Sequence, residues 1–303
     1  MSEKDKKLKI GIVGCGAIGS SLAKAIVSGF SKEGELVSLY DIDIEKAYNL
    51  SMALAMALAK GGQTIAPRLI GSQTMVSRPI KFNKKLAVLN LEDLINKADL
   101  VIEATKADVA FDIVKKVLSL SKDIMIMSVG GIIQHYQELK VLTEEKKAHI
   151  FIPSGAICGI DGLKAASLGK INKVILTTRK HPKAFLGAPY ILKKKIRLDN
   201  IDKDTVIFEG NASQAIKAFP QNINVAATLS MAGIGPQETI VRIVASPTIS
   251  RNIHEREIES DAGKIITRTE NVVHPDNPKT SYLAVLSAIA TLRQILEPIK
   301  IGT

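Results

Sequence analysis

The stretch GIVGCGAIGSSLAKAI, residues 11–26, decides the fold because three glycines separate an apolar run from a helical pattern. Gly14, Gly16 and Gly19 form a complete G-x-G-x-x-G directly after a β-branched run at residues 9–13. In that setting the first glycine allows a tight turn, the second lets the backbone approach a pyrophosphate, and the third lets the helix pack closely on the strand. The stretch therefore predicts a dinucleotide-binding βαβ unit.

An acidic residue supports a dinucleotide ligand over glycines that serve only a turn. Asp41 follows a second predicted strand, residues 36–40, about 20 residues beyond the last glycine. A carboxylate there accepts hydrogen bonds from the adenosine ribose and repels a 2′-phosphate. We expect NAD as the cofactor, with NADP possible because Lys46 is close in sequence, and we expect Ala17 and Ile18 to contact the phosphates at the helix start.

Strand and helix patterns alternate through the first half of the chain, which is typical of βαβ units in a parallel sheet. The expected strands are 9–13, 36–40, 86–89, 100–104 and 124–129, and the expected helices are 20–29, 44–60, 91–98 and 109–118. Residues 61–85 lack clean periodicity, and a structureless loop of that length is uncommon, so we expect an insertion with some structure of its own.

The sequence pattern changes after about residue 151, where loops and less regular strands replace the alternation of strands and helices. The expected strands are 174–178, 205–209 and 240–245, followed by an amphipathic helix at 281–297. The fold class we expect is α/β, with a Rossmann-type doubly wound parallel sheet and a second α/β domain.

The composition restricts the possible partners. The 303 residues suffice for about two domains. The net charge of +11 suits anionic ligands, but the basic residues are scattered, and no helix-turn-helix or zinc pattern organises them. Aromatic residues make up only 4%, which argues against stacking on nucleic-acid bases. We therefore interpret the charge as a solvated basic surface and expect no nucleic-acid partner.

The cysteines and apolar stretches bear on the compartment. Cys15 and Cys158 share no CxxC spacing, so we expect no disulfide framework and no metal site. The charged start of the chain lacks the apolar core of a signal peptide, and residues 50–59, the most membrane-like stretch, are too short to span a bilayer. We expect a cytoplasmic protein with no membrane partner.

Polar residues in otherwise apolar segments are the candidate site residues. In FPQNINVAATLSMAG, Asn222 and Asn224 precede an apolar helix, where each is either a cap or a ligand contact. In RNIHERE, His254 is either a surface histidine or the proton carrier of a site. In DNPKTSYLA, we expect Lys279, Thr280 and Ser281 at the start of the last helix, with Thr280 or Ser281 as the N-cap. This helix start either attracts a carboxylate or is simply capped.

Two further features have competing interpretations. SVGGII, residues 128–133, ends a strand whose glycine pair either forms a plain turn or lies near a nicotinamide, because ligands bind beyond the carboxyl ends of parallel strands. Cys158 could attack an aldehyde as in thiol dehydrogenases, but no base adjoins it in sequence.

Seven segments together resemble the L-aspartate dehydrogenase family, in family order and over nearly the whole chain: GIVGCGAIG, ADLVIEA, SVGGI, IFIPSGAICGIDGLKAA, FPQNINVAATLSMAG, NIHEREI and NPKTS. The resemblance implies NAD(P)-dependent oxidative deamination of L-aspartate through iminoaspartate. This intermediate either hydrolyses to oxaloacetate and ammonia or feeds NAD biosynthesis. The resemblance also implies that His254 is the active-site residue and that Gly131 and Asn224 lie near the nicotinamide.

The resemblance also implies a domain organisation. Residues 1–150 with 280–303 form the dinucleotide-binding domain, and residues 151–279 form a substrate domain that supports a homodimer. The segment 61–85 is longer than the family pattern, and Gly131 stands where alanine is expected. Asn222, Lys279 and Thr280 are the expected contacts of the dicarboxylate amino acid.

Two alternatives stay open. One is a related two-domain dehydrogenase acting on another small acid, of the homoserine or semialdehyde type. The other is a non-catalytic NAD-sensing protein whose basic surface meets nucleic acid.

Overall fold

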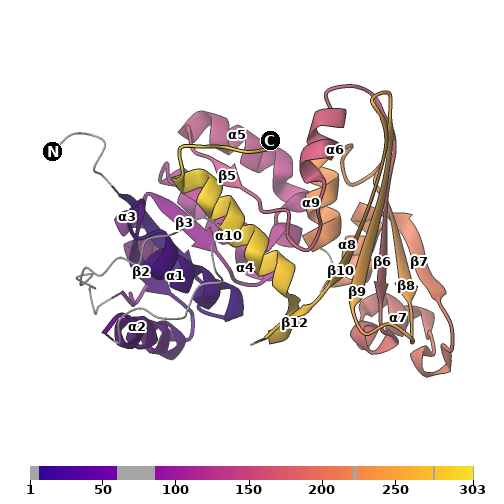
Figure 1. The fold of residues 1–303 in the computed structure, drawn as a ribbon, viewed down its shortest axis with the longest axis horizontal. Helices are drawn as coiled ribbons and strands as arrows, with labels where there is room; N and C mark the ends of the chain where they lie inside the picture. The colour runs from indigo at the N-terminus through magenta and orange to yellow at the C-terminus, as the bar shows by residue number, and fades with distance from the viewer. Residues whose placement is uncertain (1–6, 60–85, 221–223, 276, 303) are drawn as a thin grey trace. The chain divides into compact units, whose positions relative to one another are not determined.

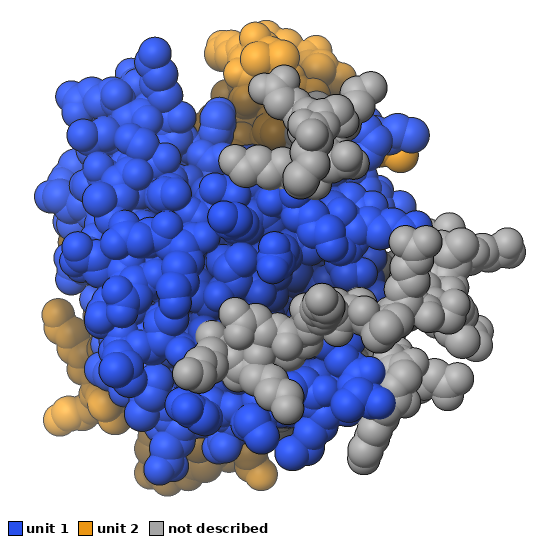
Figure 2. All heavy atoms as spheres, turned by 90° about the vertical axis from the view of Figure 1, so that its left-hand side faces the viewer, with its two compact units in different colours: residues 1–153, 288–300 blue, residues 154–287, 301–303 orange. Residues whose placement is uncertain are grey.

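The computed structural model describes residues 7–59, 86–220, 224–275 and 277–302 (Figure 1). The predicted insertion at 61–85 and Asn222 lie outside these residues, as do the side chains of residues 277–279. The chain divides into two compact units, coloured separately in Figure 2. Unit 1 comprises Met1–Pro153 and Ala288–Lys300, and unit 2 comprises Ser154–Ser287 and Ile301–Thr303.

Unit 1 contains a five-stranded sheet of order β2-β1-β3-β4-β5, in which every pairing is parallel. Its strands are β1 (Leu8–Val13), β2 (Gly34–Tyr40), β3 (Leu100–Glu103), β4 (Asp123–Ile126) and β5 (Ile150–Phe151). Beyond β2, Ala87 forms an isolated parallel bridge with Leu39, so the predicted strand at 86–89 is reduced to one residue. With this bridge counted as a strand, the order is the 3-2-1-4-5-6 of a Rossmann sheet.

Helices cover both faces of this sheet. On one face Ile12 lies beside Gly19 of α1 and Ile10 lies near Leu296 of α10, while on the other face Leu94 of α3 packs on Gly11. Because successive residues of β1 point to opposite faces, its apolar run fills both layers. The helices are α1 (Ala17–Gly29), α2 (Ile44–Ala59), α3 (Leu91–Lys97), α4 (Ala107–Ser119), α5 (Tyr136–Lys146) and α10 (Tyr282–Leu296). The predicted doubly wound α/β class is confirmed.

Unit 2 contains a mixed sheet of order β10-β9-β6-β8-β7, in which only β6 and β8 run parallel. Its strands are β6 (Ile171–Lys180), β7 (Thr205–Asn211), β8 (Ile240–Ala245), β9 (Asn252–Ser260) and β10 (Gly263–Asn271). A separate ribbon pairs β11 (Val273–His274) with β12 (Asn277–Ser281). The strands at 174–178, 205–209 and 240–245 were predicted, whereas the β9–β10 hairpin was not.

One face of the mixed sheet is covered by α6 (Ile160–Ala166), α7 (Pro189–Lys194), α8 (Ala212–Ala218) and α9 (Asn224–Ala232). Leu176 and Ile258 point from the strands to this face, where they form one apolar core with Leu163 and Leu229 of the helices. In the part of the chain that the structure describes, no helix is long and apolar enough to cross a membrane.

Candidate functional site

The glycine loop after β1 has the shape that a pyrophosphate needs. Gly14 has a φ of +95°, and a Cβ on it would lie 2.4 Å from the carbonyl oxygen of Ala104. A Cβ on Gly19 would lie 1.9 Å from the carbonyl oxygen of Gly14. A Cβ on Gly16, by contrast, would meet nothing within 4 Å. The outer two glycines therefore close the loop, and the middle one leaves an open cradle that a side chain would fill.

The start of α1 supplies the electrostatics for phosphate. Gly16 is the N-cap and provides no side-chain cap, and the first turn contains no acidic residue. The N–H groups of this turn, which includes Ala17 and Ile18, carry the partial positive charge of a helix N-terminus. The residues present therefore fit the pyrophosphate of a dinucleotide.

Asp41 lies beside the same loop. One carboxylate oxygen accepts a hydrogen bond from the backbone N–H of Cys15 at 2.8 Å, and the other accepts one from that of Asp43 at 3.0 Å. Burial and the Asp41 charge raise the pKa of the Cys15 thiol to about 12, so this thiol stays neutral. Lys46 forms an ion pair with Asp43 at 3.3 Å. The Asp41 carboxylate is thus held at the end of β2, where a ribose is expected.

Glu103, which was not predicted from the sequence, organises the carboxyl edge of the sheet. Its side chain is fully buried at the end of β3. It accepts hydrogen bonds from the backbone N–H groups of Thr105, Met127 and Ser128 at 2.7, 3.2 and 2.9 Å, and from the Thr105 hydroxyl at 2.6 Å. An acid inside the apolar run LVIEA was the available signal, because a buried carboxylate needs specific partners.

Gly131 ends a short 3₁₀ turn, Val129–Gly131, that follows β4. A Cβ on Gly131 would lie 2.0 Å from the carbonyl oxygen of Ala107, at the start of α4. The alanine that the family pattern leads one to expect therefore does not fit here without a shift of backbone. Glycine lets the loop after β4 approach the segment that follows β3.

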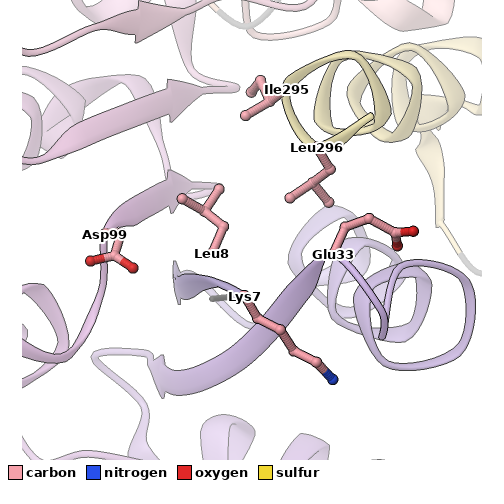
Figure 3. A pocket seen from close by; sticks show the side chains of 6 residues that line it. All are labelled: Lys7, Leu8, Glu33, Asp99, Ile295 and Leu296. Carbon is pink, nitrogen blue, oxygen red and sulfur yellow. The ribbon is translucent and has the colours of Figure 1, made fainter. Parts of the chain in front are cut away.

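The hollow in Figure 3 lies at the opposite edge of the same sheet. Three of its lining residues mark where strands begin: Leu8 starts β1, Glu33 precedes β2 and Asp99 precedes β3. Because nucleotides bind beyond the carboxyl ends of parallel strands, this hollow is not the cofactor site.

His254 is buried in the mixed sheet of unit 2, with 5% of its surface exposed. It pairs with Thr178 across β9 and β6, and its Nδ1 lies 3.0 Å from the Thr178 hydroxyl. Burial, together with the positive charges of Lys180 and Arg256, lowers its pKa to about 3. His254 is therefore not a surface histidine, and in the absence of a ligand its imidazole is neutral at pH 7.

Cys158 is exposed, and its Sγ accepts a hydrogen bond from Nη2 of Arg256 at 3.3 Å. A guanidinium cannot take up a proton, so this contact does not make Cys158 a base-activated nucleophile.

The remaining predicted site residues lie at the start of α9 and on β12. Asn224 begins α9 and is exposed, Thr280 is half-buried on β12, and Lys279 lies on the same strand. The end of this strand is anchored to β10, because the Ser281 hydroxyl donates to the side-chain oxygen of Asn271 at 2.9 Å. Over the described residues, no group of three or more His, Cys, Asp and Glu side chains could hold a metal ion.

Two family models match the chain. Residues 161–295 match the aspartate dehydrogenase C-terminal family, and residues 14–153 match the homoserine dehydrogenase NAD-binding domain. Among solved structures, aspartate dehydrogenase from Thermotoga maritima is 24% identical with a TM-score of 0.65, covering 98% of this chain and all of the other. A hyperthermophilic archaeal homoserine dehydrogenase solved with NADPH is 14% identical with a TM-score of 0.54, covering 95% of this chain and 97% of the other. These likenesses confirm the fold.

The sequence relatives are closer. L-aspartate dehydrogenase of Methanosarcina mazei is 42% identical over 98% of this chain, and that of Methanococcoides burtonii is 44% identical over 98%. Each match covers the whole length of the relative. The chain belongs to the L-aspartate dehydrogenase family.

Proposed function

We propose that this chain catalyses the NAD(P)-dependent oxidative deamination of L-aspartate. The observation that carries the proposal is the full-length identity of 42–44% with proteins named for that activity. The geometry supports it, because the chain contains both an open pyrophosphate cradle at Gly16 and a buried imidazole at His254.

We assign the cofactor to unit 1 with the C-terminal helix, close to the predicted domain of residues 1–150 and 280–303. The loop of Gly14, Gly16 and Gly19 and the first turn of α1 would hold the pyrophosphate, and Asp41 would bind the ribose and favour NAD over NADP. Gly131 and Asn224 are the proposed contacts of the nicotinamide end. When bound, the cofactor accepts a hydride from the substrate carbon.

We assign proton transfer to His254. Its Nδ1 is engaged with the Thr178 hydroxyl, so Nε2 is the nitrogen that exchanges protons. As water adds to the imine carbon of iminoaspartate, Nε2 takes one proton from the water and gives it to the nitrogen, which yields a carbinolamine. Nε2 then takes the proton of the carbinolamine hydroxyl and gives it to the same nitrogen as the C–N bond breaks, so that oxaloacetate and ammonia form. Asn222, Lys279 and Thr280 stay proposed substrate contacts, and iminoaspartate that escapes hydrolysis would be available to NAD biosynthesis.

The test is an assay of the purified chain with L-aspartate and each cofactor, and with oxaloacetate plus ammonia in the reverse direction. We expect reduced nicotinamide to form with L-aspartate, faster with NAD than with NADP. Absence of turnover with L-aspartate under both cofactors would overturn the proposal.

The match of residues 14–153 to the homoserine dehydrogenase NAD-binding domain favours one second candidate, a dehydrogenase of the homoserine type. Including L-homoserine and aspartate semialdehyde in the assay separates the two activities. A third candidate, the NAD-sensing protein, would bind nucleic acid in a salt-dependent way without turnover.

We also propose a cytoplasmic homodimer. Both cysteines are free, which fits a reducing compartment. The homodimer is the arrangement that the family resemblance implies. Light scattering should give twice the chain mass of 32.6 kDa, and a monomer would contradict the dimer.

A further inference from the structure

We propose that Arg256 binds a carboxylate of the substrate and is therefore a specificity-determining residue of the site. The proposal rests on the proposed function, because it names the residue that would select an acidic amino acid.

The environment of Arg256 is unusual for a buried cation. Its side chain is 2% exposed. Its Nη2 donates to Cys158 Sγ at 3.3 Å and to the hydroxyl of Thr267, so neither partner is a carboxylate. Its Nε is the one buried side-chain nitrogen or oxygen among the described residues that has no hydrogen-bond partner. A guanidinium taken out of water without an anion costs several kcal/mol.

The acids of the same strand cannot supply this anion. Alternate residues of a strand point to opposite faces, so Glu255 and Glu257 project away from Arg256. On that other face the Glu255 carboxylate is already shared by Arg179 at 3.0 Å and Arg268 at 2.6 Å. The arginines of the outer face, Arg179, Arg242 and Arg268, therefore have carboxylate partners within the chain, whereas Nε of Arg256 remains as a donor for a ligand.

Arg256 lies next to the proposed proton-transfer residue, His254. Arg256 and His254 are two residues apart on β9 and point to the same face. Since Thr178 pairs with His254, Lys180 lies on that face on the other side of the histidine. Two cations thus flank the imidazole, which matches a ligand with two carboxylates. Cys158 is exposed and contacts Arg256, so the buried guanidinium touches a residue that reaches the surface.

The same charges give the ligand a second effect. Lys180 and Arg256 both lower the pKa of His254. A bound dicarboxylate would offset them, raise the pKa of His254 and so increase its capacity to take up a proton. Binding of the acidic substrate would then prepare the base that acts on it.

The first test compares Arg256→Met with Arg242→Met. Arg242 pairs with Glu209 at 2.7 Å on the outer face, so its variant controls for loss of one arginine from the same sheet. We expect Arg256→Met to raise KM for L-aspartate roughly 10- to 100-fold, with a smaller change in kcat and an unchanged KM for NAD. Arg256→Lys, which keeps the charge but not the planar fork, should fall between. An unchanged KM for L-aspartate in Arg256→Met would overturn the inference.

The second test measures binding without turnover. Succinate, a dicarboxylate that has no amino group to oxidise, is titrated calorimetrically into each variant with NAD present. Wild type and Arg242→Met should bind it alike, and Arg256→Met at least tenfold more weakly. If wild type does not oxidise L-aspartate, the proposed function fails, while the succinate titration still decides whether Arg256 holds a carboxylate.

Stability distinguishes a binding residue from a structural one. Because Arg256 has no carboxylate partner to leave unpaired, replacing it with an apolar side chain of similar length should preserve or raise Tm. A fall in Tm of many degrees in Arg256→Met would show that the guanidinium maintains the sheet, and that result would overturn the assignment.

Discussion

The carboxylate of Asp41 accepts a hydrogen bond from the backbone N–H of Cys15, with 2.8 Å between the two heavy atoms. This bond joins the acid that follows β2 to the middle of the glycine loop that follows β1. One carboxylate oxygen therefore fixes the loop, and the other accepts a hydrogen bond from the backbone N–H of Asp43, which holds the carboxylate at the edge where a ribose is expected.

Asp41→Ala should lower kcat/KM with NAD more than with NADP, so that cofactor preference moves toward NADP. The substitution removes the charge that opposes a 2′-phosphate, together with the ribose hydrogen bonds. Asp43→Ala is the matched control, since Asp43 pairs with the exposed Lys46 and only its backbone contacts Asp41. An unchanged ratio of the two kcat/KM values in Asp41→Ala would place the ribose elsewhere.

Gly16→Val and Gly19→Ala should fail for different reasons. A Cβ on Gly16 enters open space, so Gly16→Val should keep a wild-type Tm and lose NAD affinity. A Cβ on Gly19 would lie 1.9 Å from the Gly14 carbonyl oxygen, so Gly19→Ala should lower Tm itself. Thermal unfolding and NAD titration measure the two effects separately. Wild-type NAD affinity in a folded Gly16→Val would refute the cradle.

Glu103→Gln should destabilise unit 1 even though the side-chain shape is kept. The carboxylate accepts hydrogen bonds from Thr105, Met127 and Ser128, and the amide NH₂ of glutamine would face N–H groups instead of accepting from them. We expect a loss of about 2–3 kcal/mol in the free energy of unfolding, measured by urea titration. Glu92→Gln, on an exposed pair with Lys116, should cost well under 1 kcal/mol. Equal small losses in both variants would contradict the role of Glu103.

Much of unit 1 could be predicted because its signals are local. The glycine spacing and the apolar runs predicted the parallel strands. Gly14, Gly16 and Gly19 each have the surroundings that the motif requires. The predicted strand at 86–89 is reduced to a single bridge. Its backbone hydrogen bonds to β2 join only Leu86 and Val88 to Leu39. How far a segment pairs depends on the neighbouring strand, which its own sequence does not encode.

The hairpin of unit 2 was not predicted because polar residues at inward positions disrupt the alternating pattern of a half-buried strand. A half-buried strand alternates apolar and polar residues, but on β9 the inward positions include His254 and Arg256. These residues made the segment look like a polar loop around a candidate histidine. His254 could therefore be identified as a candidate, but its burial and its depressed pKa depend on β6 and on the helices that cover the sheet.

Stability should depend on pH through His254. Its pKa is about 3 in the folded chain and about 6.5 when exposed, so between these values the unfolded state binds more protons. This contribution is intact above about pH 6.5 and is lost as the pH falls toward 3. In His254→Gln the loss should disappear. From about pH 7 to about pH 5, wild type should therefore lose about 2 kcal/mol more than the variant in urea titrations. Parallel pH profiles for the two proteins would contradict burial of a neutral imidazole.

The last prediction concerns proton transfer by His254. A positioned general acid or base contributes about 10²- to 10⁴-fold, so His254→Ala should lower kcat by about 10²-fold or more and leave NAD affinity near wild type. Thr178→Val removes the hydroxyl that lies 3.0 Å from Nδ1 and keeps the shape of the side chain, so it should lower kcat by a smaller factor. Thr177→Val is the control, because Thr177 is also buried but points to the other face of β6. Steady-state kinetics and an NAD titration on all three variants provide the comparison. Near-normal turnover in His254→Ala would remove His254 from the mechanism, and equal losses in the two threonine variants would show that packing, not orientation of the ring, explains the effect of Thr178.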